Sequence, residues 1–414
     1  MVVGWAHWIG TTTEVPVSHD VWAGIDAGKI AHHCVVINDA GEKLLSRKVS
    51  NDEADLLRLI KDVAAIANSG RVQWALDLNA GGAALLITLL VEHQLDFVYI
   101  PGRTVHHASA AYRGDGKSDA KDAAVIADQA RMRRDLHPFR QRDEITMDLR
   151  LLCARRTDLA MDRNRAIARL RATLLEYFPA LERAFDYAHR RGALTLLTRF
   201  QTPAAIRHAG PVKISAWLRR HVAYSPDTIA QTAVSAAASQ RTVVPGQQTA
   251  AKIAAQLAQQ VITLDAEMDT IEAEITERFR DHAYAPAIES MPGFGPLLGA
   301  ELLVGINGDT ANYENVDRLA SIAGLAPVPH DSGRITGNLK RPRRYDRRLL
   351  RACYMAAHNS LRTNPESRAF YDRKRAAGKR HNQAVLALAR RRLNVLWALI
   401  RDETTYQPVT LKAA

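Results

Sequence analysis

The sequence predicts an α/β domain in the first third of the chain, then a long helical arm, then a mainly α-helical C-terminal domain. Three observations lead to this prediction: β-rich runs alternate with amphipathic stretches up to about residue 134, two long stretches beyond residue 147 have helical periodicity, and turns interrupt a basic helical region after residue 290. A length of 414 residues suits two or three domains. The predicted boundaries are a tail at 1–20, the α/β domain at 21–143, the arm at 144–282, the C-terminal domain at 283–402 and a tail at 403–414.

The α/β domain begins with three short β-rich runs at 21–27, 33–39 and 43–49. Turn residues separate them, which predicts a meander of hairpins. Apolar residues at three-to-four spacing then predict a helix over Glu53–Ala67. The remaining predicted elements are a strand at 72–78, a helix at 83–92, a strand at 97–101 and a helix from about 118 to 134.

Four aspartates occupy particular places in this βββαβαβ order. Asp26, in GIDAGK, lies near the end of the first strand, and Asp77, in WALDLNAGG, lies near the end of the fourth. Asp119 and Asp122 are three residues apart and share one face of the last helix. Singly, each is commonplace, since an Asp at a strand end is usually a turn residue and a D-x-x-D pair is usually solvated. Together they match a ribonuclease-H-like fold, in which clustered carboxylates hold divalent metal against a nucleic-acid phosphate.

Positive charge is concentrated near the C-terminus. The formal net charge is +12, but residues 331–401 alone contain 19 Lys and Arg against 4 Asp and Glu. Such asymmetry indicates a surface for a polyanion, with an ordinary solvated basic face as the alternative. The candidate nucleic-acid-binding side chains are Lys340, Arg341, Arg343, Arg344, Arg347 and Arg348.

Other classes of protein are disfavoured. No stretch approaches the roughly 18 apolar residues of a membrane span, and no basic segment followed by an apolar run marks secretion. The three cysteines are far apart and lack metal-ligand spacing. We expect a cytoplasmic protein without a membrane partner, associated with the nucleoid when it acts.

Two long stretches, Met147–Glu182 and Lys252–Phe279, repeat apolar residues at three and four positions like a coiled-coil seam. A Pro-, Ser- and Ala-rich stretch at 201–246, with short helices of its own, separates them. Two interpretations stay open: an intramolecular helical hairpin, or an arm through which two copies dimerise.

The segment SMPGFGPLLGAELL is a P-G-x-G turn that opens into a helix, as in a helix-hairpin-helix element. Gly293 and Gly295 there could expose backbone N–H groups to a DNA phosphate. A purely structural helix–helix turn uses the same glycines. Further on, Ser332 precedes Gly333 in a polar loop before an Arg-rich helix, which makes it a candidate nucleophile toward a phosphodiester.

Five segments resemble a known family. GIDAGK, DGKSDAKDAA, MPGFGPLLGAELL, LASIAGLAPVPHDSGR and RACYMAAHNSLRTNPESRAFYDR are similar to the DEDD transposases of bacterial insertion sequences (the insertion sequence 110 family), and the resemblance runs from about Val21 to Arg401. It implies a RuvC-like N-terminal domain, a helical arm and a C-terminal domain with a nucleophilic serine. The family's first, third and fourth acids fall on Asp26, Asp119 and Asp122, and its serine falls on Ser332.

The resemblance also implies partners and a reaction. The expected activity is DNA strand cleavage and exchange through a phosphoserine–DNA intermediate, with two Mg²⁺ ions on the carboxylates. The expected partners are double-stranded donor and target DNA, a structured non-coding RNA as guide, and further copies of the chain, as a dimer and as a tetramer on DNA. The active site would form between protomers.

This chain departs from the family in two places. Asp77 stands where the family usually has Glu, and Lys340-Arg341-Pro342-Arg343 replaces a Lys-Arg-Gly-Asn-like turn. Two other functions remain as alternatives: a metal-dependent junction-resolving nuclease with water as nucleophile, and a non-enzymatic nucleic-acid-binding scaffold.

Overall fold

The computed structural model describes residues 20–68, 70–78, 81–112, 116, 118–136, 143–221, 224–334, 336–340 and 342–408. Of the predicted site residues, Arg341 lies outside these ranges. The chain divides into two compact units, Met1–Gln141 and Arg142–Ala414, and each has a hydrophobic core of its own.

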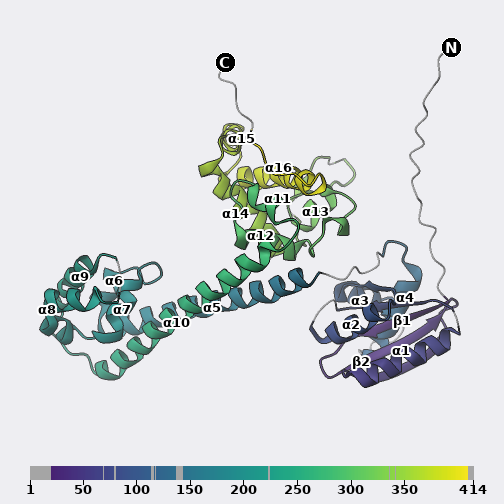
Figure 1. Cartoon of the computed structure of the whole chain (residues 1–414), viewed down its shortest axis with the longest axis horizontal. Helices are drawn as coiled ribbons and strands as arrows, with labels where there is room; N and C mark the ends of the chain where they lie inside the picture. The colour runs from purple at the N-terminus through teal and green to yellow at the C-terminus, as the bar shows by residue number, and fades with distance from the viewer. Residues whose placement is uncertain are drawn as a thin grey trace, which may run out of the picture. The chain divides into compact units, whose positions relative to one another are not determined.

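A five-stranded sheet of order β3-β2-β1-β4-β5 forms the centre of the first unit (Figure 1). The strands are β1 (Val21–Asp26), β2 (Ala31–Asn38), β3 (Lys43–Ser50), β4 (Val72–Leu76) and β5 (Phe97–Tyr99). The first three pair antiparallel, which confirms the predicted meander, and β4 and β5 continue the sheet in parallel from β1. Parallel pairing requires crossover connections, and the predicted helices supply them.

Helices cover both faces of this sheet. Side chains of α1 (Glu53–Ala67) and α2 (Ala84–Glu92) share one hydrophobic cluster with Ala23 and Ile25 of β1. Trp22, on the opposite face of β1, packs against the clusters of α3 (Gly102–Ser109) and α4 (Asp119–Met132). The predicted helices are confirmed. Helix α3 was not predicted. Its only buried side chain is that of Val105, so the sequence of α3 shows no apolar stripe.

Gly24 sets how closely α4 approaches the sheet. A Cβ atom on Gly24 would lie 2.3 Å from the carbonyl oxygen of Ala123 and 2.3 Å from the backbone nitrogen of Ala127. Backbone atoms cannot rotate away, so only glycine allows α4 to rest on β1 at this point. Since Asp122 is one residue before Ala123, this contact also positions the N-terminal turn of α4 beside the end of β1.

Gly24→Ala is expected to destabilise the first unit by about 3 kcal/mol, because α4 must move off the sheet. Thermal unfolding followed by circular dichroism would measure the loss. Gly295→Ala is the control, since no atom lies within 4 Å of a Cβ built there. An unchanged unfolding temperature for Gly24→Ala would contradict the close contact.

In the second unit, α5 (Glu144–Tyr177) and α10 (Gln247–Arg280) pair along their length as an antiparallel arm (Figure 1). Ion pairs cross between them, including Arg156 with Glu272 at 2.6 Å and Arg278 with Asp148 at 2.8 Å. The intramolecular pairing is therefore the one observed, and dimerisation through the arm stays a prediction. The predicted helix to Glu182 ends at Tyr177, because Pro179 lacks an N–H group and starts a new helix.

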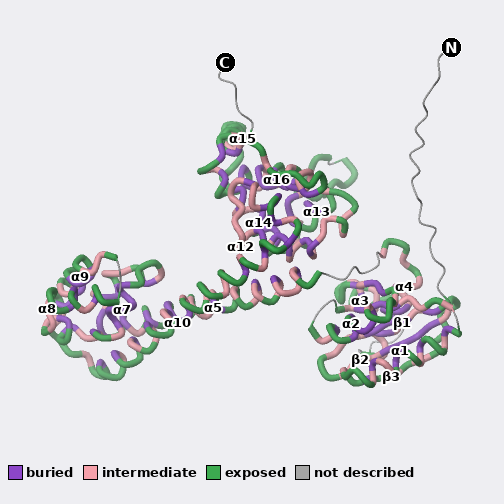
Figure 2. Tube along the Cα trace, viewed as in Figure 1, coloured by how far each residue is buried: buried purple, intermediate pink, exposed green. Residues whose placement is uncertain are grey.

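Four short helices close one end of the arm over a core that they share with α5 and α10, drawn as buried in Figure 2. They are α6 (Pro179–Ala184), α7 (Arg191–Arg199), α8 (Pro203–Leu218) and α9 (Pro226–Ala238). This end is called the arm tip, residues 179–240. It confirms that the Pro-, Ser- and Ala-rich stretch contains short helices.

The remaining helices pack on the other end of the arm in one cluster that includes Leu149 of α5 and Phe279 of α10, and two short strands between them in the chain stay exposed. They are α11 (Ala285–Ser290), α12 (Pro296–Gly305), α13 (Val316–Ile322), the two-residue strands β6 (Val328–Pro329) and β7 (Leu339–Lys340), α14 (Arg347–Thr363), α15 (Pro365–Ala376) and α16 (His381–Arg401). This C-terminal region is mainly α-helical, as predicted. Among the described helices, none combines the length and the apolarity that crossing a membrane requires.

Candidate catalytic and nucleic-acid-binding sites

Asp26 and Asp77 come together because β1 and β4 are parallel neighbours. Ile25 pairs with Leu76, so the next residue on each strand is an aspartate at the same edge of the sheet. Side chains alternate along a strand, so Asp26 lies on the face of Gly24, toward α4. The backbone N–H of Ala27 donates to Oδ1 of Asp77 at 3.1 Å and ties the two strand ends together.

Asp122 joins these two carboxylates from α4. Asp26, Asp77 and Asp122 all line one pocket of about 470 Å³ between the strand ends, α3 and α4. The first turn of α4 is fixed by Ser118, whose hydroxyl oxygen accepts a hydrogen bond from the N–H of Lys121. Three of the four predicted acids thus border one cavity.

Asp119 lies at the edge of this group. It does not line the pocket, but its charge acts on His33, the residue paired with Asp26 across β1 and β2. In the part of the chain that the structure describes, no three His, Cys, Asp or Glu side chains are close enough together to hold a metal ion. The four acids share one end of the sheet without forming a closed ligand set.

The electrostatics of Asp77 are consistent with a cation site. Burial raises the pKa of the Asp77 carboxyl group, the backbone N–H of Ala27 opposes this, and the negative charge of Asp122 raises the pKa further. A bound cation would offset the effect of burial and the repulsion from Asp122, both of which disfavour the charged carboxylate of Asp77. The pocket offers carboxylate oxygens, the hard ligands that Mg²⁺ prefers, so the residue types that line it suit a divalent ion, although the described side chains are not gathered into a ligand set.

Among the other side chains that line the pocket are His106, Tyr112 and Lys121, none of which was predicted from the sequence. Tyr112 donates to Oδ2 of Asp128 at 2.5 Å, and burial raises its pKa to about 12, so it remains a neutral phenol. His106 and Tyr112 reach the pocket through α3 and the turn after it. Lys121 lies between the two aspartates of the D-x-x-D motif, and that position was the only sequence feature that could have indicated a role for Lys121.

Asp77→Asn is expected to raise the unfolding temperature of the first unit by about 2–4 °C in metal-free buffer at pH 7.5. The folded pKa of Asp77 lies above the unfolded value, so its contribution to stability is present at low pH and is lost as pH rises through the folded pKa. The gain should therefore shrink at pH 4, and calorimetry in EDTA would measure it. Asp39→Asn, at an exposed turn, is the control. A lower unfolding temperature for Asp77→Asn would contradict the prediction.

Ser332 lies exposed in the loop between β6 and β7. The loop is held at its base, where the N–H of His330 donates to the carbonyl of Asn338 at 2.8 Å and Oδ1 of Asp331 accepts from the N–H of Asn338 at 2.9 Å. Asp331 is therefore engaged in shaping the loop. The structure presents the Ser332 side chain to solvent on a small hairpin.

The predicted basic residues flank this hairpin. Lys340, Arg343, Arg344, Arg347 and Arg348 are all exposed. Asp346 caps α14 by accepting hydrogen bonds from the N–H groups of Arg348 and Leu349. The cap fixes the direction in which this Arg-rich segment enters α14, beside the Ser332 hairpin.

Gly293 and Gly295 differ in what surrounds them. Gly293 has φ +87°, and a Cβ there would lie 2.2 Å from the carbonyl oxygen of Ala356 in α14. A Cβ on Gly295 would meet no atom within 4 Å. Packing therefore requires glycine at position 293 whatever binds there, and a phosphate contact at either residue stays a prediction.

Comparisons with known proteins identify the family. A family model described as "Transposase", of the DEDD IS110 type, matches residues 23–179, and one described as "Transposase IS116/IS110/IS902 family" matches residues 285–372. The "Insertion element IS900 uncharacterized 42 kDa protein" of Mycobacterium paratuberculosis is 60% identical over 96% of this chain and 100% of its own length. The chain belongs to the IS110/IS116/IS902 transposase family.

A second relative of this transposase family is more distant. The "Insertion element IS116 uncharacterized 44.8 kDa protein" of Streptomyces clavuligerus is 49% identical over 94% of this chain and 97% of its own length. A solved structure of T. thermophilus RuvC with a Holliday junction substrate matches 29% of this chain and 100% of its own, at 18% identity and a TM-score of 0.23. Membership of the family implies a DNA-transposing enzyme that depends on a divalent metal, and it implies DNA binding.

Proposed function

We propose that this transposase is a Mg²⁺-dependent DNA recombinase that cuts and rejoins strands through a phosphoserine intermediate on Ser332. The observation that carries the proposal is the pocket that Asp26, Asp77 and Asp122 all line, at the ends of two parallel strands and the first turn of α4. A second feature supports it, namely an exposed serine on a hairpin flanked by arginines.

Asp26, Asp77 and Asp122 are the residues that would hold Mg²⁺, with Asp119 as a fourth ligand. When bound, Mg²⁺ would supply positive charge that stabilises the scissile phosphate and the leaving oxygen. The carboxylates themselves orient and confine that charge. Tyr112, held neutral by burial and by Asp128, adds no negative charge to the pocket.

Ser332 is the proposed nucleophile. Its Oγ forms a bond to phosphorus, the bond from phosphorus to one deoxyribose oxygen breaks, and the hydroxyl proton is lost while the departing oxygen gains one. A hydroxyl of the second strand then displaces Ser332, so that rejoining needs no outside energy. His330 and Asp331 are the only bases adjacent in sequence, and Asp331 is engaged in the loop. Activation is therefore assigned to the carboxylate site.

A structured non-coding RNA from the same element is the proposed guide that selects donor and target DNA. Ser332 and the carboxylates belong to different units of the chain. We assign the complete site to two protomers within a homo-oligomer, which would keep a single subunit inactive.

The direct experiment is to incubate the protein with Mg²⁺, donor and target DNA, and RNA transcribed from the flanking non-coding sequence. A covalent protein–DNA adduct that resists detergent and maps to Ser332 would support the proposal. Cleavage without any adduct would refute the phosphoserine step, and equal activity without RNA would refute guidance.

Replacing Arg343, Arg344, Arg347 and Arg348 by Ala is expected to weaken nucleic-acid binding and to flatten its salt dependence. Each phosphate that the variant no longer neutralises lowers the log–log slope by about 0.9 on duplex DNA. Titrations between about 50 and 200 mM salt, the range over which such phosphate interactions are usually resolved, would measure the slope. Arg165 and Arg169, exposed on α5, provide the control double variant. An unchanged slope in the fourfold variant would mean that these arginines form only a solvated face.

A further inference from the structure

The arm tip has a basic surface that the charge distribution along the chain conceals. Residues 179–240 contain eight Lys and Arg against three acids, although the chain outside residues 331–401 has a slight net negative charge. All three acids are paired, Glu182 with Arg171, Asp186 with His189 and Asp227 with Arg219. The excess positive charge at the arm tip is therefore available to an external anion.

A pocket of about 900 Å³ opens within this surface. Its lining comes from the loop before α7 and the start of α7, and from the loop between α8 and α9 and the start of α9. The polar and aromatic residues of the lining are Asp186, His189, Arg190, Arg191, His221, Tyr224 and Ser225. A volume of this size is within the range of pockets that hold small organic ligands, about 300–1,000 Å³.

The rings of Tyr224 and His221 border the pocket on the side of the loop between α8 and α9. Tyr224 is 84% exposed, which is unusual for a side chain of this size in a folded segment. His221 stacks on Trp217 with ring centroids 4.4 Å apart, and its Nδ1 donates to the carbonyl of Trp217 at 2.9 Å. The His221 ring is thus fixed in orientation, and its Nδ1 is already engaged. Aromatic rings beside cations are the usual means of holding an unstacked base and its phosphate.

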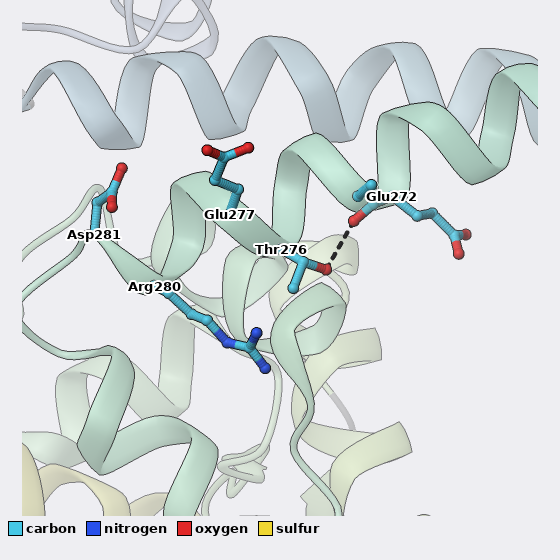
Figure 3. A pocket seen from close by; sticks show the side chains of 6 residues that line it. Glu272, Thr276, Glu277, Arg280 and Asp281 are labelled. Carbon is cyan, nitrogen blue, oxygen red and sulfur yellow. Dashed lines mark hydrogen bonds between the residues drawn. The ribbon is translucent and has the colours of Figure 1, made fainter.

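Another hollow, on α10, has the opposite charge. It is lined by Glu272, Glu277, Arg280 and Asp281, and Figure 3 shows these side chains along the last turns of the helix. Arg280 is already paired with Glu289 at 2.9 Å. Three carboxylates there would repel a phosphate, whereas the arm-tip pocket has two arginines and one acid, which is paired.

We infer that the arm-tip pocket binds an unpaired nucleotide of a single nucleic-acid strand. The base stacks against Tyr224 and His221, while Arg190 and Arg191 pair with the adjoining phosphates. Duplex nucleic acid is excluded because its bases are stacked on each other and cannot reach the rings. The inference is independent of the proposed reaction, since it needs neither Ser332 nor the carboxylates of the first unit.

The test uses the full-length protein and an unstructured strand labelled with fluorescein, in RNA and DNA forms, together with the corresponding duplex. Tyr224→Ala should weaken single-strand binding about tenfold, as removal of one stacking partner does, and Tyr224→Phe should retain binding. Arg190→Ala should lower the salt slope by about 0.7. Lys213→Ala is the matched control, because Lys213 is exposed on the same tip but does not line the pocket.

A photocrosslink locates the binding site. A strand carrying 5-bromouridine should crosslink to Tyr224 or His221, as located by mass spectrometry, and the tighter of the RNA and DNA forms identifies the source of the nucleotide. Unchanged single-strand affinity in Tyr224→Ala, or an equal loss on the duplex, would overturn the inference. Loss of binding in both Tyr224→Ala and Tyr224→Phe would also overturn it, because the phenyl ring would then not be the binding element.

Discussion

Ser332→Ala is expected to abolish both the covalent protein–DNA adduct and strand exchange, with a loss of at least about 10³-fold in the rate of exchange. An alanine has no side-chain oxygen to attack phosphorus, so the proposed phosphoserine bond cannot form. Ser332 is exposed on a hairpin whose base is held by His330, Asp331 and Asn338. The variant should therefore fold normally and still bind RNA and DNA, since exposed substitutions usually change stability by less than about 0.5 kcal/mol.

Thr336→Ala is the matched control, because it removes an exposed hydroxyl from the same loop. It should retain adduct formation and exchange. Denaturing gels that resolve free DNA from protein-linked DNA would measure both variants. If Ser332→Ala cuts DNA at the wild-type rate, water is the nucleophile, and the junction-resolving nuclease is the correct interpretation of the carboxylate pocket.

The elements that depend on local sequence could be predicted. The meander follows from turn residues between β-rich runs, and Ser118 marks the start of α4 as an N-cap should. The short helix α3 and the two-residue strands β6 and β7 could not be predicted, because each is short and lacks a periodic apolar pattern of its own. Local periodicity detects elements that bury a stripe of side chains, and these bury almost none.

The residues of the candidate site also divide into those with a local sequence signal and those without one. Asp26 and Asp77 were found because strand ends can be read from the sequence, and their proximity follows from the parallel pairing of β1 and β4. His106 and Tyr112 were missed because they reach the pocket only through α3 and its packing. For Gly293, the sequence could not separate a phosphate contact from a packing requirement, since the backbone of α14 lies 63 residues further on at Ala356.

The basic surface of the arm tip cannot be recognised from the net charge of the whole arm. Acidic residues of α10 offset the basic residues of the arm tip when the charges are added. In the structure those acids lie along α10, where several pair with arginines of α5. Only the folded arrangement separates the two sets of charges.

Asp26→Asn and Asp122→Asn are each expected to reduce strand exchange by at least about 10³-fold, because a neutral amide cannot hold the divalent charge that stabilises the scissile phosphate. Folding should be unaffected, since both side chains border a pocket and are not part of the core. Asp39→Asn is the control, and full activity in both site variants would refute the metal site.

Mixing the two kinds of inactive protein tests where the site is assembled. Ser332→Ala protomers have an intact carboxylate pocket, and Asp26→Asn protomers have an intact serine. If the site forms between protomers, a mixed oligomer contains some interfaces that join the intact serine of one chain to the intact carboxylates of another. Partial exchange activity should then return in the mixture, while each variant alone stays inactive. If mixing restores nothing, although mixed oligomers are shown to form, the serine and the carboxylates must act within one chain.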